Sequence, residues 1–289
     1  QEADLEFVRG RIADNNSAVA REHYEYSLEK WKTLVTGEND DPRWQAKKGH
    51  VLFYLGLWWR THAERHRPDF DLAFGNARRY FAAAIETFEQ IGVLDAGASG
   101  RDPTACDTSP YEEEEALSQN TEDGGLSIGQ VLVAKYINYL AESLHRLERW
   151  EELELVAIRA KGLHQQQQNL FRVARAEGFL AEVAGAKHDW DAAQRYAKAA
   201  LELIDSAELC QRGRQDADFY DWINSFHRSW YLFSLGKAQL NQGEIDAAVD
   251  TLEKARAVAQ PDYDPKLYSL ILDQLQKGYF EQGLYLPAF

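Results

Sequence analysis

Residues 140–160 read LAESLHRLERWEELELVAIRA, and this stretch decides the fold because its spacing returns twice further along the chain. The two further copies are LAEVAGAKHDWDAAQRYAKAA at residues 180–200 and LGKAQLNQGEIDAAVDTLEKA at residues 235–255. In every copy a small residue is followed nine residues later by Trp or Ile and nineteen residues later by Ala; the small residues are Ala141, Ala181 and Gly236. A pattern repeated at fixed offsets predicts stacked helical hairpins, with the small residue where two helices cross too closely for a larger side chain.

Weaker copies flank these three on both sides. Leu55-Gly56 opens a copy before them, and residues 3–13 provide the first helix of an earlier one. Leu275 opens a last copy, which the chain leaves unfinished at Phe289. The sequence therefore predicts an all-α fold, a right-handed α-solenoid of antiparallel helical hairpins with no sheet.

The pattern resembles the tetratricopeptide repeat (TPR), a helix-turn-helix unit with a small residue in its first helix and a turn that often carries Gly. Gly243 stands at this turn in one copy, and Glu148 and His188 stand at the equivalent places of the other two. TPR units are about 34 residues long, whereas the small residue recurs here after 40 residues (141 to 181) and then after 55 (181 to 236). The resemblance implies a TPR-like superhelix whose concave groove holds a protein or peptide partner.

We expect one solenoid domain over residues 1–289 with two inserted loops. The larger loop, at about 94–125, is rich in Gly, Ser, Asp and Glu and has too little apolar surface to offset the entropy of ordering. The smaller loop, at about 205–221, takes up the 15 extra residues of the long interval (55 − 40). The chain begins at Gln1, contains no Met and ends within a repeat, which favours a fragment of a longer protein.

Composition and charge narrow the class of partner. The formal net charge of -15 disfavours nucleic acid, because phosphate binding needs a basic surface. No apolar run of membrane-spanning length and no signal peptide is present, so we expect a cytoplasmic protein without a membrane partner. Cys106 and Cys210 are the only cysteines and fall in expected loops, which favours free thiols over a disulfide framework.

The candidate partner-binding residues lie on the first helix of each hairpin, the helix that lines the concave face of such solenoids. They mix cationic, aromatic and polar groups: Arg60, Lys135, Asn138, His145, Arg175, Trp230, Phe233 and Lys237. The alternative is that Phe53 and Phe233 belong to the core between repeats and that the charges form a solvated face. The two-carboxylate clamp of chaperone-binding TPR proteins is disfavoured, because Asn138 and Glu142 stand where that clamp has Lys and Asn.

Other chemical constellations are weaker. His62 and His66 have the spacing of two helical metal ligands, but the residues between them differ from those of a zinc protease, so solvent-facing histidines are favoured. Cys106 lies in an acidic stretch, which disfavours the thiolate that a nucleophile needs. No phosphate-binding Gly-Lys-Ser/Thr sequence is present. We therefore expect no cofactor, no metal and no enzymatic activity.

Several short strings add a finer resemblance. They are FYLGLWWR (53–60), LHRLERW (144–150), GFLAEVA (178–184) and YFEQG (279–283). They look like the repeat arm of large cyanobacterial signal-transducing NTPases with numerous domains (STAND proteins), in which the arm senses a ligand or partner and restrains an NTPase core. Because no NTPase motif falls within this chain, the resemblance implies only the sensor or regulatory arm of a multidomain signalling protein. The alternative is a free-standing TPR adaptor that scaffolds the assembly of a protein complex.

Overall fold

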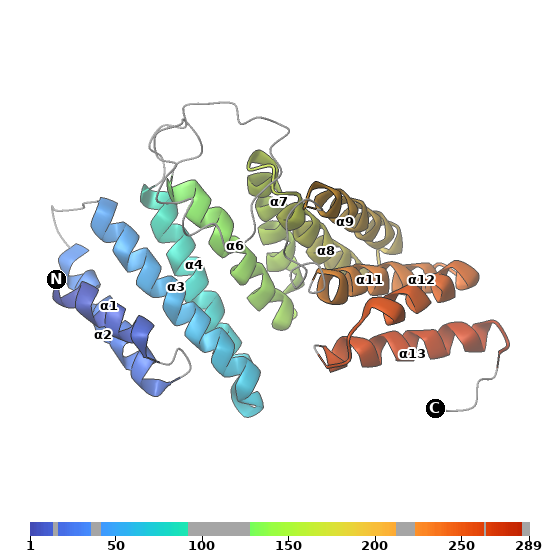
Figure 1. The fold of residues 1–289 in the computed structure, drawn as a ribbon, viewed down its shortest axis with the longest axis horizontal. Helices are drawn as coiled ribbons and strands as arrows, with labels where there is room; N and C mark the ends of the chain where they lie inside the picture. The colour runs from blue at the N-terminus through green and yellow to red at the C-terminus, as the bar shows by residue number, and fades with distance from the viewer. Residues whose placement is uncertain (14–16, 36–41, 92–127, 212–222, 263, 285–289) are drawn as a thin grey trace. The chain divides into compact units, whose positions relative to one another are not determined.

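The computed structural model describes residues 1–289 apart from 14–16, 36–41, 92–127, 212–222, 263 and 285–289 (Figure 1). It divides into two compact units, unit 1 over Gln1–Glu152 and unit 2 over Leu153–Phe289. The described residues of both units form helices, turns and short connections, and no strand occurs among them. The predicted all-α architecture is therefore confirmed.

Unit 1 is built from helices that pack on their neighbours in chain order. They are α1 (Glu2–Ile12), α2 (Ala18–Val35), α3 (Pro42–Arg65), the 3-10 turn η1 (Arg67–Asp69), α4 (Phe70–Ile91) and α6 (Ile128–Arg146). In Figure 1, α1 lies against α2, α3 against α4, and α4 against α6. The rings of Tyr24, Phe74, Phe81 and Phe88 fill the space between them and are almost fully buried. Each such ring stabilises the fold by about 1.5 to 3 kcal/mol relative to an exposed one.

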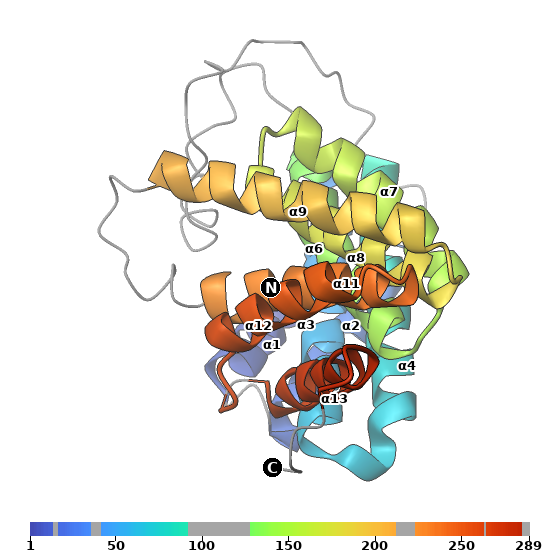
Figure 2. The same ribbon diagram turned by 90° about the vertical axis from the view of Figure 1, so that its right-hand side faces the viewer.

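Unit 2 is likewise built from helices that pack on their neighbours in chain order. Its helices are α7 (Trp150–Gln166), which begins at the end of unit 1, α8 (Leu170–Ala186), α9 (Trp190–Gln211), the π-helical η2 (Ile223–Arg228), α11 (Ser229–Asn241), α12 (Ile245–Val258) and α13 (Pro265–Glu281). Figure 2 shows α9 alongside α8, and α11 in contact with α9 and α12. The apolar side chains between these helices, including Ile204, Leu252 and Ile271, are fully buried.

One predicted loop boundary is wrong. The insertion expected at about 205–221 does not begin at residue 205, because α9 continues to Gln211. The physical reason is local: Ala207, Glu208 and Leu209 are good helix formers, and the first helix breaker is Gly213. The remainder of the expected insertion, from 212 on, lies outside the described residues.

The hairpin turns repeat the same backbone geometry. Glu148, His188 and Gly243 have positive φ angles of 53°, 59° and 81°. In each turn the next residue donates its N–H to a carbonyl five residues back; Asp189 N, for example, lies 2.9 Å from Ala184 O. This hydrogen bond ends a helix by the Schellman motif, which needs one left-handed residue. The equivalence of Glu148 and His188 to Gly243 is therefore confirmed.

The small residues stand at close helix crossings, as predicted. A Cβ atom on Gly56 would lie 2.5 Å from the Phe81 ring, and one on Gly236 would lie 2.6 Å from Leu252 Cγ. Ala141 and Ala181 are buried at the corresponding places. The recurring small position is thus fixed by the space available between the two helices of a hairpin.

The remaining expectations about organisation stay predictions. Residues in a repeat array contact mainly their neighbours, so two compact units are compatible with one repeat domain over 1–289. The loop expected at about 94–125 falls within 92–127, outside the described residues. Among the helices that the structure describes, none is long and apolar enough to cross a bilayer.

Candidate functional site

The eight residues predicted to bind a partner fall into both units. Arg60 on α3 and Lys135, Asn138 and His145 on α6 belong to unit 1. The four in unit 2 are Arg175 on α8 and Trp230, Phe233 and Lys237 on α11. Each set lies on first helices of hairpins, and each is described on its own.

Arg60 is held in a half-buried ion pair. Its Nε and Nη2 atoms donate to Glu142 Oε1 at 3.2 and 2.8 Å, and Nη2 lies 3.4 Å from Glu64 Oε1. Burial acts to lower the pKa of Arg60, but the two carboxylates outweigh it and raise the pKa above its usual value. The guanidinium charge is therefore largely neutralised within the protein. Glu142, the residue that disfavoured a carboxylate clamp, is the group that neutralises it.

His50 on α3 and Lys135 on α6 interact electrostatically. His50 Nδ1 lies 2.9 Å from the Tyr136 hydroxyl. Burial, with a smaller effect from the positive charge of Lys135, lowers the pKa of His50, so this imidazole is neutral at neutral pH. Lys135 is half-buried, and among the described residues it forms no ion pair. Its ammonium is a charge that a partner can use.

Asn138 is less accessible than the sequence suggested, whereas His145 reaches the surface. Asn138 is 1% exposed, and its Nδ2 donates to Ala134 O at 3.1 Å. A partner cannot reach this amide without moving α6. His145 is half-buried, with its ring edge-on to Trp150 at 5.8 Å between centroids. His145 therefore remains a possible contact, whereas Asn138 belongs to the interior.

In unit 2, the candidate polar groups lie on α8 and α11. The Arg175 guanidinium lies 5.6 Å from the centre of the Phe179 ring. The Ser234 hydroxyl donates to the Glu182 carboxylate, which links α11 to α8. Lys237 is half-buried, and within the part of the chain that the structure describes its side chain has no ion-pair partner. Lys237 thus resembles Lys135 in offering an unpaired cation.

The two aromatic residues predicted in unit 2 have structural roles. Phe233 is 4% exposed and belongs to the core cluster with Leu252 and Ile271. Trp230 packs against the same cluster, and its Nε1 lies 3.3 Å from Asp264 Oδ2. The alternative that Phe233 is core between repeats describes its position correctly. Trp230 is only half-buried, so one part of its ring reaches the surface.

A recurring feature escaped the sequence analysis. An aromatic residue stands two positions before the small residue in three copies, Tyr54, Tyr139 and Phe179. Each ring carries an arginine: Arg11 over Tyr54 at 4.3 Å, Arg60 over Tyr139 at 5.9 Å and Arg175 over Phe179 at 5.6 Å. All three rings are half-buried. The constant offset could have revealed the aromatic residues, but not the arginines, two of which come from a different helix.

In unit 1 these rings belong to a continuous aromatic cluster. The Phe53 and Tyr136 rings are stacked at 3.9 Å, and Tyr139 meets Phe53 edge-on at 5.2 Å. Tyr54 also meets Phe53, at 5.6 Å. Because the buried Phe53 holds the rings around it, Tyr54 and Tyr139 are positioned before any partner arrives.

The structure adds no support for the metal-binding or nucleophilic sites considered from the sequence. The ring of His62 stacks on Trp58 at 4.9 Å and on His66 at 4.3 Å, and His62 Nε2 lies 3.7 Å from Asp69 Oδ2. Among the described residues, no three or more His, Cys, Asp or Glu side chains gather as metal ligands do. Cys106 and the side chain of Cys210 lie outside what the structure describes.

Comparison with known proteins identifies the fold. No protein-family model matches the chain, and no curated protein matches it. The similar solved structures include the apo form of RapI, with a TM-score of 0.58 and 13% identity, and BtubC (BKLC) from P. vanneervenii, with a TM-score of 0.53 and 16% identity. The RapI match covers 99% of this chain and 78% of that chain, and the BtubC match covers 91% and 83%.

These similarities show a shared fold. At such low identity they extend to the arrangement of helices alone, and they agree with the TPR-like helical repeats described above. The finer resemblance to the repeat arm of STAND NTPases gains no support from them and stays a hypothesis.

Proposed function

We propose that this TPR-like domain binds a protein or peptide segment on the first-helix surfaces of its hairpins, and that it acts by binding rather than by catalysis. The observation that carries the proposal is the set of arginine-covered rings at Tyr54, Tyr139 and Phe179. Partly exposed aromatic and Arg side chains are the groups enriched where proteins bind one another. Tyr54 and Tyr139 in unit 1 and Phe179 in unit 2 hold equivalent places in their repeats, and surfaces of this kind bind extended or helical segments.

The charges indicate the chemistry of the ligand. Lys135 and Lys237 flank these surfaces without an ion-pair partner among the described residues. The chain as a whole carries a formal net charge of -15, so an acidic segment is repelled elsewhere and attracted where these cations lie. We therefore propose a ligand that combines acidic with apolar or aromatic side chains.

The biological role proposed is that of a sensor or regulatory arm in a larger signalling protein, located in the cytoplasm. The preformed aromatic cluster around Phe53 supports a ligand-responsive role, because its rings are positioned before a ligand arrives. The free-standing adaptor would use the same surfaces. The two roles differ in whether the gene encodes an NTPase or effector domain beyond these residues.

Site-directed photo-crosslinking tests the binding surface. p-Benzoylphenylalanine is introduced at Tyr139 or Phe179, and at the exposed Leu72 and Leu155 on second helices as matched controls. Each protein is irradiated in lysate of the source organism, and the adducts are identified by mass spectrometry. The proposal expects a protein adduct at Tyr139, at Phe179 or at both positions that is absent from both controls. Adducts at Leu72 or Leu155 alone, or none at the first-helix positions, would overturn it.

A further inference from the structure

Three basic side chains lie on the first helices of unit 1: Arg11 on α1, His50 on α3 and Lys135 on α6. The Arg11 guanidinium lies 4.3 Å from the centre of the Tyr54 ring and donates to its hydroxyl. His50 stands one turn before Tyr54, on the same face of α3. Lys135 directly precedes Tyr136, whose hydroxyl lies 2.9 Å from His50 Nδ1. The three basic groups are therefore linked through one face of α3.

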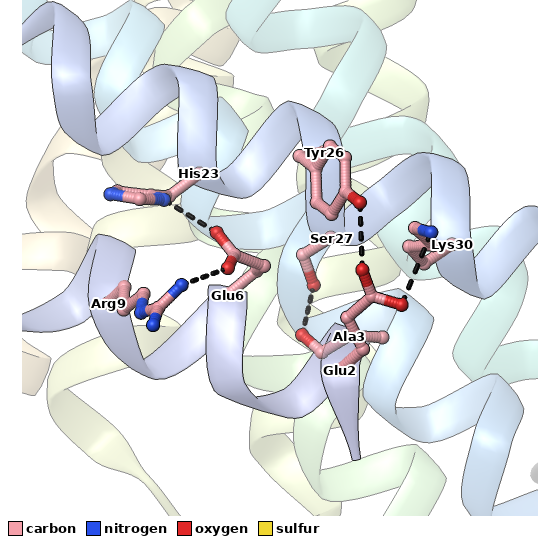
Figure 3. Close-up of polar contacts among 8 residues, drawn as sticks. All are labelled: Glu2, Ala3, Glu6, Arg9, His23, Tyr26, Ser27 and Lys30. Carbon is pink, nitrogen blue, oxygen red and sulfur yellow. Dashed lines mark hydrogen bonds and ion pairs between the residues drawn. The ribbon is translucent and has the colours of Figure 1, made fainter.

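Arg11 keeps its positive charge, whereas the other arginine in the last turn of α1 does not. Tyr54 orients the Arg11 guanidinium without neutralising it, because a phenol is uncharged near neutral pH. Arg9 instead pairs with Glu6 Oε1 at 2.6 Å. Figure 3 shows the same carboxylate directed at His23 of α2, whose Nδ1 lies 2.7 Å from Glu6 Oε2. This contact joins α1 to α2, so the end of α1 that carries Arg11 is in place before a ligand arrives.

The surroundings of His50 are positively charged. Burial, followed by the positive charges of Lys135 and then Arg11, lowers the pKa of His50 below the usual histidine value. Among the described residues, neither Arg11 nor Lys135 forms an ion pair. A chain with a formal net charge of -15 thus has a local positive potential at this place, and such a potential concentrates anions.

The other described groups around His50 add no competing charge. From α4, Phe88 meets the His50 ring edge-on at 5.3 Å. On α2, burial raises the pKa of Tyr24 to about 12, so this phenol stays neutral. Lys47, one turn before His50, is paired with Asp4 at 2.7 Å. His50 is therefore the group of this cluster that can change its charge near neutral pH.

We propose that one carboxylate of the bound segment lies against Arg11 and Lys135, and that His50 takes up a proton when this carboxylate binds. The site rests on the proposed function, because it belongs to the same first-helix surface. A carboxylate offsets the two cations that keep His50 neutral, so the imidazole binds its proton more tightly in the complex. By linkage, protonated His50 holds the carboxylate more tightly, and binding strengthens as the pH falls towards about 6.

The contact between His50 and Tyr136 permits this change of charge. A neutral imidazole can accept at Nδ1 from the Tyr136 hydroxyl, and an imidazolium can donate from Nδ1 to the same oxygen. Tyr136 is 2% exposed and stacks on Phe53 at 3.9 Å. The imidazole is thus held in one position in both protonation states, and proton uptake needs no rearrangement of α3 or α6.

NMR spectroscopy of the histidine rings tests whether the three groups form one site. The His50 signal is identified by its loss in His50→Gln, and the signals of the other seven of the eight histidines report on the fold. In the free protein, Lys135→Gln and Arg11→Gln should each move the titration midpoint of His50 to higher pH, because each removes a positive charge. The matched control is Lys32→Gln, an exposed residue on α2 of the same unit, which should leave the midpoint unchanged. An unchanged midpoint in both site variants would overturn the proposal.

Two small probes then test the carboxylate and its source. N-acetylaspartic acid amide supplies a side-chain carboxylate, and N-acetylalanine supplies a C-terminal one. Each replaces chloride at constant ionic strength, up to about 100 mM, which detects a millimolar dissociation constant. At least one probe should increase the proton affinity of His50 by about threefold or more, and the probe that does so identifies the source. The response should vanish in the double variant Arg11→Gln with Lys135→Gln.

The outcomes separate this site from the proposed function. No response of His50 to either probe, or a response that persists in the double variant, would overturn the site at Arg11 and Lys135. Crosslinking at Tyr139 or Phe179 reports binding on the first-helix surfaces whether or not a carboxylate lies here. Crosslinks without a His50 response would therefore retain the proposed function and reject this site, whereas a His50 response without crosslinks would do the reverse.

Discussion

The α-carbon of Gly56 lies so close to the ring of Phe81 that a Cβ atom would approach it to 2.5 Å. Both residues are buried, one on each helix of the α3–α4 hairpin. The ring cannot retreat easily, because Phe53 and Tyr139 pack on it at 5.7 and 5.6 Å. The two helices of this hairpin can therefore pack this closely only if residue 56 is glycine.

Gly56→Ala should therefore destabilise the protein by about 1 to 3 kcal/mol through overpacking. Gly75→Ala is the matched control, because a Cβ at this helical glycine meets nothing within 4 Å. That substitution should stabilise α4 by about 0.5 to 1 kcal/mol. Urea denaturation of both variants measures the difference, and equal midpoints would show that the crossing is not tight.

A glycine substitution in one hairpin turn should raise the stability of the protein. His188 holds a left-handed conformation with φ of 59° at a place where Gly243 serves the equivalent turn. His188→Gly should stabilise the protein by about 1 kcal/mol, because left-handed backbone costs about 1 to 2 kcal/mol for a residue with a Cβ. Gly243→Ala should have the opposite effect. Thermal denaturation should place the two variants on opposite sides of the wild type.

The buried His164 predicts a pH dependence of stability. Burial, then the positive charge of Arg172, lowers the pKa of His164 to about 3 from 6.5. Between these two values the unfolded chain binds a proton that the folded chain does not. The contribution of neutral His164 to the free energy of unfolding is therefore fully present above pH 6.5. Below pH 6.5 it falls by about 1.4 kcal/mol per pH unit.

Urea denaturation at pH 7 and pH 5.5 tests this effect in a window above the range where carboxylates titrate. His164→Gln removes the larger of two such groups while keeping a polar side chain, and it should reduce the dependence to the part that comes from His50, whose pKa is also lowered by burial. A wild-type protein equally stable at both pH values would contradict the assignment.

Arg60 and Glu142 should stabilise unit 1 as a pair. Glu142→Gln leaves the half-buried guanidinium with weaker acceptors and should cost about 1 to 3 kcal/mol. The control is Asp250→Asn, which removes the partner of Lys254 in an exposed pair whose side chains are 65% and 64% exposed. Its cost should stay below about 0.5 kcal/mol. Equal effects on the melting temperature would show that burial adds nothing to the Arg60 pair.

Partner binding should depend on the accessible cations of unit 2. The double reversal Arg175→Glu with Lys237→Glu should weaken binding of a verified partner by more than about tenfold, about 1.4 kcal/mol or more. The effect should shrink at high salt, because ions screen exposed charges. Titration calorimetry at two salt concentrations measures both, with Lys254→Glu on α12 as the control. Unchanged affinity would exclude these two residues from the binding surface.

Some features of this protein follow from local sequence alone. The fixed offsets after Ala141, Ala181 and Gly236 predicted the hairpins, the turn positions and the tight crossings. These features depend on helix periodicity, on the short-range hydrogen bonds of the turn and on the size of one side chain. Such interactions join residues close in sequence, so their pattern can be recognised without the tertiary structure.

The sequence predicts where a helix ends less accurately than it predicts that the helix exists. The boundary expected at residue 205 was wrong because polarity suggested a loop, whereas helix propensity carries α9 to Gln211. Low apolar content in a short segment does not end a helix that is already nucleated.

Only the tertiary structure decided which predicted site residues a partner can reach. Arg60 meets Glu142 across 82 positions of sequence, and Phe233 enters a core with Ile271. Asn138 turns its amide to its own helix. Helix periodicity places a side chain on a face but does not tell which helix covers that face, because the covering helix arrives through contacts between distant residues. For the same reason, the absence of an ion-pair partner for Lys135 and Lys237 among the described residues could be recognised only from the structure.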